Sequence, residues 1–168
     1  MKNDAVSPVI GVLLMLTLTL IVAAIVNSYA GGLVDTEPKT PSATIQVKYS
    51  QTNGMEIRHV SGDPIPTSSL KVIVRPSETM DRNAGQYSSE IDKQYITNLS
   101  GERSWASEIT SLKVGDLSYI TYENLSYIQN IPEDKYWFNQ SSNQGNSFYL
   151  ELYYKNNIIS RNEILIEG

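Results

Sequence analysis

The side chains best suited to chemistry are few in this sequence. Its 168 residues include a single histidine, His59, and no cysteine. The lack of cysteine excludes disulfides, thiolate metal ligands and a thiol nucleophile. Asp63 follows His59 closely, yet one histidine and one carboxylate make an incomplete metal or catalytic site. We therefore expect no enzyme activity, no metal and no other cofactor.

The remaining charged residues restrict the class of partner. There are 13 lysines and arginines against 18 aspartates and glutamates, so the net charge is −5. Carboxylates such as Glu102, Glu108, Asp116 and Glu123 lack the paired spacing of acid–base catalysis or of a calcium loop. The cations are scattered singly, whereas a phosphate backbone requires a basic patch. This pattern argues against a nucleic-acid partner.

The segment from His59 to Ile65 predicts a tight corner between strands. Gly62 can adopt a positive φ, Asp63 can accept hydrogen bonds from backbone N–H groups two residues on, and Pro64 ends local pairing. We therefore assign His59, Gly62 and Asp63 to a structural turn.

Three asparagines match the acceptor pattern for N-glycosylation, N-x-[ST]: Asn98, Asn124 and Asn139. Asparagine and serine are frequent in this chain, so chance is a rival explanation for each match. All three lie in the part of the chain that we expect to face outward. A glycan there would shield the surface against proteolysis and change what it adheres to.

The elements that position these residues begin with an uncharged N-terminal run. Residues 5–34 contain no Asp, Glu, Lys or Arg, and residues 6–26 are almost entirely apolar. About 20 such residues form a helix that crosses about 30 Å of hydrocarbon. Pro8 suits the first helical position, and the pair Gly31-Gly32 suits the end of the helix. The run therefore predicts a helix of membrane-spanning length.

Three interpretations compete for this helix: a membrane anchor, a secretory signal peptide and a filament-forming helix. The small residues of Ser28-Tyr29-Ala30, followed by Gly31, would suit a signal peptidase. The apolar run is longer than the 7 to 15 residues typical of a signal peptide, and Asp4 offsets the charge of Lys2. Signal cleavage is therefore the least favoured of the three.

The N-terminus closely resembles the signature of archaeal type IV pilins and pilin-like proteins, which is carried here by DAVSPVIGVLLM at residues 4–15. The match includes the pairs Ser7-Pro8 and Ile10-Gly11, which hydropathy alone would not demand. The resemblance implies a leader at residues 1–4 that a prepilin peptidase removes between Asp4 and Ala5. Cleavage after Ala5 is the alternative.

The helix contains residues that allow close helix packing. Gly11, Ala23 and Ala24 permit neighbouring helices to approach, and Thr17 and Thr19 can bond to their own helix or across to another. Bonds within the helix are the favoured explanation for the threonines. The resemblance implies these partners: other pilin subunits through the helix, the prepilin peptidase, an assembly ATPase with its membrane platform, and membrane lipid before assembly.

After the helix, apolar and polar residues alternate at a period of two, which indicates strands. The alternation is clear at residues 44–49 and 70–74 and clearest at 147–154. Residues 155–157 then form a turn and residues 158–166 return, so we expect a C-terminal hairpin. The sequence thus predicts an α+β protein, a long hydrophobic helix followed by an antiparallel β-sandwich of immunoglobulin-like or Greek-key type.

Turn-forming residues separate these strands. We expect exposed loops at residues 78–87 and 132–146, and we favour the core for the aromatic pair Trp137-Phe138.

The predicted organisation is a leader at 1–4, a transmembrane and polymerisation helix at 5–32, a linker at 33–43 and a β-rich extracellular head at 44–168. The resemblance implies a single-pass membrane subunit with its head outside, which becomes part of an extracellular filament for adhesion or surface contact. The alternative is a membrane-anchored or secreted binding protein that does not polymerise.

Overall fold

The computed structural model describes residues 6–32, 39–129, 131 and 133–168. The chain divides into two compact units, Met1–Lys39 and Thr40–Gly168, and each is described by itself.

The first unit contains helix α1, Val6–Gly32, of 27 residues. It begins two residues before the expected start, so Pro8 lies within the first turn, where its missing N–H group is not needed. The predicted end at Gly31-Gly32 is confirmed. At 1.5 Å per residue, the helix is roughly 40 Å long.

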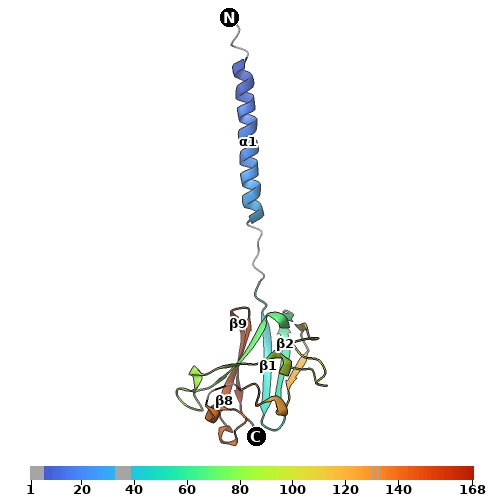
Figure 1. The fold of residues 1–168 in the computed structure, drawn as a ribbon, viewed down its shortest axis with the longest axis vertical. Helices are drawn as coiled ribbons and strands as arrows, with labels where there is room; N and C mark the ends of the chain where they lie inside the picture. Colours follow the sequence, from blue (N-terminus) through green and yellow to red (C-terminus); the bar gives the residue numbers. More distant parts are fainter. Residues whose placement is uncertain (1–5, 33–38, 130, 132) are drawn as a thin grey trace. The chain divides into compact units, whose positions relative to one another are not determined.

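The second unit is built of antiparallel strands in two larger sheets and one small one (Figure 1). The three-stranded sheet has the order β1-β2-β7, with β1 at Ala43–Ser50, β2 at Gly54–Gly62 and β7 at Leu117–Ile120. The four-stranded sheet has the order β5-β4-β8-β9, with β5 at Ser89–Glu90, β4 at Leu70–Pro76, β8 at Ser147–Tyr154 and β9 at Asn157–Leu165. Strand β3, Ile65–Pro66, pairs with β6, Ser111–Leu112.

Apolar side chains from both larger sheets meet in one core. Ile57 of β2, Val72 of β4 and Leu150 of β8 are all fully buried in it. The predicted fold class, a long apolar helix followed by antiparallel sheets, is confirmed. The predicted hairpin is also confirmed: β8 and β9 pair through a two-residue turn, in which Lys155 adopts a positive φ of 55°.

Three aromatic rings fill the centre of this core. Tyr49 packs edge-on against Phe138 and Phe148, with ring centroids 5.4 and 5.3 Å away, and the two phenylalanines stack at 4.5 Å. The Tyr49 hydroxyl donates to the Phe138 carbonyl at 3.0 Å. Burial, with a smaller contribution from Tyr122, raises the pKa of Tyr49. The core assignment of Phe138 is therefore confirmed.

The two predicted loops are only partly exposed, which corrects the sequence interpretation. Ala84 and Tyr136, one from each loop, are buried together with Ile131 in a second small core. The rings of Tyr87 and Tyr136 lie 5.2 Å apart, and the Tyr87 hydroxyl donates to Glu133 at 2.8 Å. The cluster joins segments about 50 residues apart in the sequence, so no local pattern could indicate it.

Short 3₁₀ helices connect the strands, at Thr67–Ser69, Ala84–Gln86, Lys93–Tyr95, Tyr122–Asn124, Asp134–Tyr136 and Ser141–Asn143.

Candidate functional site

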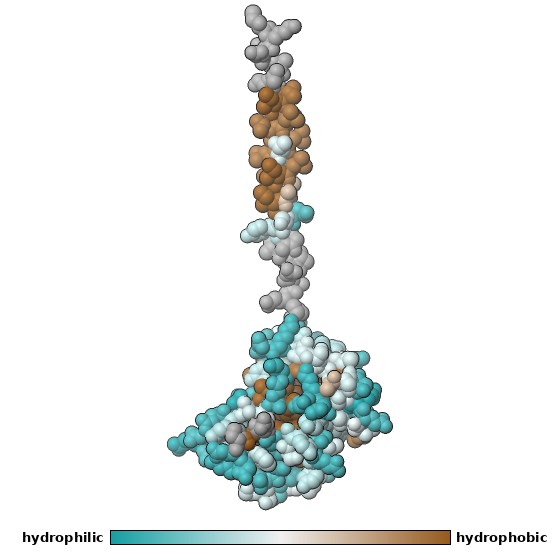
Figure 2. All heavy atoms as spheres, in the orientation of Figure 1, coloured by the Kyte–Doolittle hydropathy of each residue, from teal (hydrophilic) through white to brown (hydrophobic). Residues whose placement is uncertain are grey.

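The largest exposed apolar surface that the structure describes surrounds helix α1. Every described side chain from Pro8 to Ala30 is exposed, and Met15 reaches 71%. This span has a mean hydropathy of 2.9, so by length and composition it could cross a membrane. Apolar residues colour the helix brown in Figure 2, whereas the visible face of the strand-rich unit is mostly hydrophilic. A surface of this kind needs lipid or other helices around it.

The small and hydroxyl residues of α1 lie on more than one face. With 100° between successive residues, Thr17 and Ala24 share one face, and Thr19 and Ala23 share another roughly 130° away. Gly11 lies on a third side, roughly 100–130° from either face, and an added Cβ atom at this position would meet nothing within 4 Å outside the helix's own backbone. Places for close helix approach therefore exist on several sides of α1.

Both threonine hydroxyls have partners within the helix. Thr17 donates to the Leu14 carbonyl at 3.0 Å, and Thr19 donates to the Leu16 carbonyl at 2.9 Å. These bonds satisfy the hydroxyl donors without a neighbouring helix. The predicted leader cleavage position, Asp4 and Ala5, lies outside the described residues.

Comparison with known proteins finds a family that the N-terminal segment resembles. Residues 4–45 match the family described as archaeal type IV pilin, N-terminal. This match covers α1 and the start of β1, about a quarter of the chain. The matched family is structural rather than enzymatic.

A curated relative extends the similarity. An uncharacterized protein of Archaeoglobus fulgidus is 42% identical over 80 residues, which cover 46% of this chain and 57% of the relative. This chain thus matches little more than half of that relative's length.

In the strand-rich unit, the predicted turn residues Gly62 and Asp63 close a corner. Gly62 has a φ of 112°, and an added Cβ atom would lie 2.1 Å from the Ser42 carbonyl oxygen, so only glycine fits. Asp63 bonds to Ser42 twice: its N–H donates to the carbonyl at 2.8 Å, and its carboxylate accepts from the N–H at 3.1 Å. This carboxylate thus ties the start of β1 to the end of β2.

His59 lies in strand β2, on the side facing the core. It is fully buried, and Nε2 donates to the Ser61 carbonyl at 3.0 Å. Nδ1 is buried without a hydrogen-bond partner among the residues described. Those residues also contain no group of three metal-ligating side chains.

The three sequons differ in their surroundings. Asn98 lies in a surface turn beside Leu99, which is 80% exposed, and its amide donates to the Ser100 hydroxyl at 2.9 Å. Asn124 ends a 3₁₀ helix and precedes a buried leucine. Asn139 is half-buried, and its Oδ1 lacks a partner in the described part of the chain. All three asparagines are half-buried, but only the sequon of Asn98 has an exposed middle residue.

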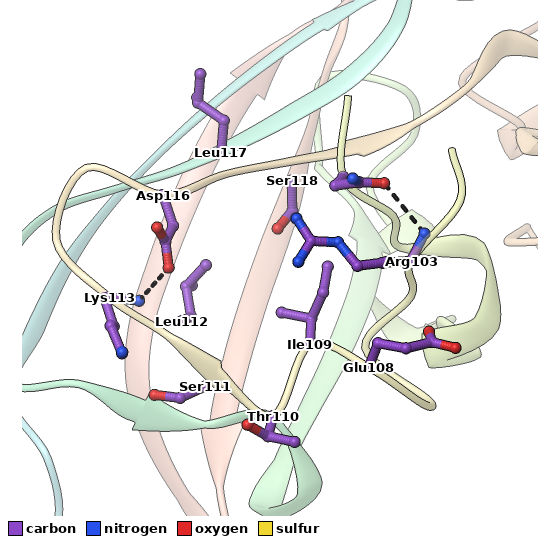
Figure 3. Close-up of a pocket in the computed structure, with 11 residues that line it drawn as sticks. Arg103, Glu108, Ile109, Thr110, Ser111, Leu112, Lys113, Asp116, Leu117 and Ser118 are labelled. Atoms are coloured by element: carbon purple, nitrogen blue, oxygen red, sulfur yellow. Dashed lines mark hydrogen bonds between the residues drawn. The ribbon is translucent and has the colours of Figure 1, made fainter. Parts of the chain in front are cut away.

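A hollow of about 310 Å³ adjoins Asn98 (Figure 3). Arg103 extends toward Ser118 in this view, and its backbone N–H donates to the Asn98 side chain at 3.1 Å. The Asp116 carboxylate accepts from the Lys113 N–H at 2.8 Å. These polar groups thus bond to the backbone of the turns that surround the hollow.

Sequence reasoning missed a buried charge on the four-stranded sheet. Glu151 of β8 is only 3% exposed, on the side opposite to Leu150 and Leu152. Arg75 and Arg161 are its ionic partners. The available signal was an isolated carboxylate within the aromatic and aliphatic run at 148–154.

Proposed function

We propose that this chain is a structural subunit of an archaeal type IV pilus-like surface filament, and that it polymerises through α1. The supporting observation is that the segment matching archaeal pilins contains α1, whose described side chains from Pro8 to Ala30 are all exposed. The head would face outward and serve adhesion or contact with surfaces.

Helix physics supports the transfer of α1 from membrane to filament. Lipid chains are as apolar as leucine, so a helix gains little by leaving neighbouring helices for lipid, or the reverse. The described residues of α1 carry no charge that either environment would have to bury. Small residues on several faces of α1 suit a core in which each helix has several neighbours.

Processing and assembly complete the proposed mechanism. A prepilin peptidase removes residues 1–4 between Asp4 and Ala5, or one residue later. The subunit then waits in the membrane with α1 in lipid, and a membrane platform driven by a separate ATPase adds it to the filament. The competing function is a single-pass anchored protein, because a helix of the length and hydropathy of Pro8–Ala30 would serve equally well as an anchor.

The N-terminus of the native protein tests the proposal. We would shear filaments from cells and compare the N-terminal peptides in the sheared and membrane fractions by mass spectrometry. A start at Ala5 or Val6 with the helix retained in the sheared fraction supports assembly. A start at Gly31 would make the helix a discarded signal, and an intact Met1 start confined to membranes would leave only an anchor.

A pair of neighbouring substitutions tests the role of helix packing. Gly11→Leu adds a side chain at a position where a Cβ atom would meet nothing within 4 Å outside the helix's own backbone, so a clash would arise only with other molecules. We expect this variant to enter membranes normally but to be depleted from sheared filaments. Val12→Leu changes an adjacent apolar position and should assemble normally. Equal amounts of both variants in filaments would contradict close packing at Gly11.

We also propose Asn98 as the glycosylated acceptor among the three sequons, because the residue that follows it, Leu99, is 80% exposed, whereas the corresponding Leu125 is buried. The same mass spectra should show added sugar mass on the peptide that contains Asn98, and Asn98→Gln should remove it. Glycan on Asn139 alone would overturn this assignment.

A further inference from the structure

A carboxylate buried on the outer side of the four-stranded sheet holds two arginines in place. Glu151 lies 3.6 Å from Nη2 of Arg75 and 3.4 Å from Nε of Arg161. The Tyr153 hydroxyl donates to the same carboxylate at 3.2 Å. One carboxylate neutralises only one of two guanidinium groups, so this arrangement leaves positive charge on the sheet surface.

Further contacts fix the orientation of both guanidinium groups. Nη1 of Arg75 donates to the Gly85 carbonyl at 2.9 Å. The guanidinium of Arg161 lies over the Tyr149 ring, 4.1 Å from its centroid. Each arginine has five N–H donors, and these contacts use only some of them. The remaining donors are oriented in advance, which reduces the entropy lost when a ligand binds.

A hollow of about 360 Å³ lies beside these arginines, within the size range of roughly 300–1,000 Å³ typical of small-molecule sites. A third arginine, Arg82, lines it, and its exposed side chain has no ion pair or hydrogen bond within the described residues. Glu78 also contributes to the lining. Among the charged residues that line the hollow, with Glu151 beneath, three arginines face two carboxylates, a sum of +1 in a chain whose net charge is −5.

We propose that this hollow binds the carboxylate of an acidic sugar, such as a uronic acid unit. A local charge of +1 matches one carboxylate, whereas a phosphate or sulfate dianion would be repelled by Glu78 and Glu151. The hollow is larger than a carboxylate requires, and Asn83 and Gln86 line it with amide donors and acceptors that suit sugar hydroxyls. These amides favour a sugar acid over an acidic side chain of a protein.

Binding to the full chain in detergent micelles tests the site independently of filament assembly. Calorimetric titration with glucuronate should show saturable binding, and glucose, sulfate and the α-amide of N-acetylglutamate should each bind at least about tenfold more weakly. Arg82→Gln should weaken glucuronate binding about fivefold or more, because it removes one charged donor. Arg103→Gln is the matched control, since it removes the same charge from the hollow beside Asn98, and it should leave binding unchanged.

The remaining outcomes would overturn the proposal. Absent glucuronate binding would remove the site, and equal binding of glucose would show that charge is not recognised. Tighter binding of sulfate would contradict the match to a single carboxylate, and tighter binding of the α-amide of N-acetylglutamate would assign the site to a peptide. An equal loss in Arg82→Gln and Arg103→Gln would indicate a general charge effect. Arg82 is exposed, so its substitution should leave the tryptophan fluorescence of the head unchanged.

Discussion

Leucine lies in opposite environments in the two units of this chain. Leu14 of α1 is 64% exposed, whereas Leu150 of β8 is fully buried among side chains of its own unit. The strand-rich unit obtains its hydrophobic stabilisation internally, and α1 must obtain it from lipid or from other helices. The strand-rich unit buries its apolar side chains within itself, whereas the apolar side chains of α1 remain exposed until lipid or other helices cover them. Substitutions in α1 should therefore change location and assembly, and substitutions in the head should change folding.

The strongest test removes a ring from the centre of the head. Phe148→Ala deletes a fully buried side chain that contacts Tyr49 and Phe138, and should lower the free energy of unfolding of the head by about 3–5 kcal/mol. Denaturant unfolding followed by fluorescence measures this directly, because both tryptophans, Trp105 and Trp137, lie in the head.

The control for this test is Ile158→Ala, at a position that is 52% exposed, and it should change the free energy of unfolding by less than about 1 kcal/mol. Helical circular dichroism from α1 in micelles should persist in both variants. Loss of the helical signal in Phe148→Ala would show that the two units are not independent.

The converse test introduces a charge into the helix. Lysine near the centre of a membrane helix costs about 3 kcal/mol in insertion, so Leu18→Lys should be depleted from membranes and from sheared filaments. Leu18 is 61% exposed in the isolated chain, so unfolding of the head should not change. Leu18→Ile should behave as the unsubstituted protein. Normal membrane recovery of Leu18→Lys would contradict a lipid-embedded or helix-packed environment.

Alkaline pH should also distinguish the two units. Burial raises the pKa of Tyr49, so above the ordinary tyrosine pKa of about 10 the unfolded state loses its proton first. The stability that the protonated phenol contributes is complete below pH 10 and is lost as the pH rises, by at most about 1.4 kcal/mol per pH unit.

Tyr49→Phe should reduce this alkaline loss, measured as the free energy of unfolding of the head between pH 9 and 11. Tyr87 and Tyr153, whose pKa values are also raised, should account for part of the loss that remains. An unchanged pH dependence in Tyr49→Phe would show that the phenol ionises equally in both states.

The sequence predicted local features well. The apolar run located α1 to within two residues, and alternation located β8, because both patterns depend only on neighbours along the chain. Strand β2 was missed although Met55, Ile57 and His59 alternate, because the buried histidine was interpreted as part of a turn. The core position of a polar side chain depends on partners that the sequence does not reveal.

The features of the site that were missed depend on distant contacts. The hollow over Glu151 combines Arg75, Arg82 and Arg161 from segments up to about 85 residues apart. No spacing rule joins such residues, because Arg75 and Arg161 come together only when β8 pairs with both β4 and β9. The small residues of α1, in contrast, could be identified from the sequence, and the 3.6-residue turn of a helix gives the face on which each one lies.

The smallest expected effect concerns the helix hydroxyls. Thr17→Val and Thr19→Val keep the side-chain shape but remove bonds to the carbonyls of Leu14 and Leu16. These bonds lie within one helix, so both variants should enter filaments to the same extent as the unsubstituted chain, with the change in stability below about 0.5 kcal/mol. If either hydroxyl bonds to a neighbouring helix instead, its loss should cost about 0.6 kcal/mol per contact. Repetition along a filament would make that cost measurable as lower thermal stability of sheared filaments. Because the two threonines lie on different faces, an effect in only one variant would identify the face that contacts a neighbour.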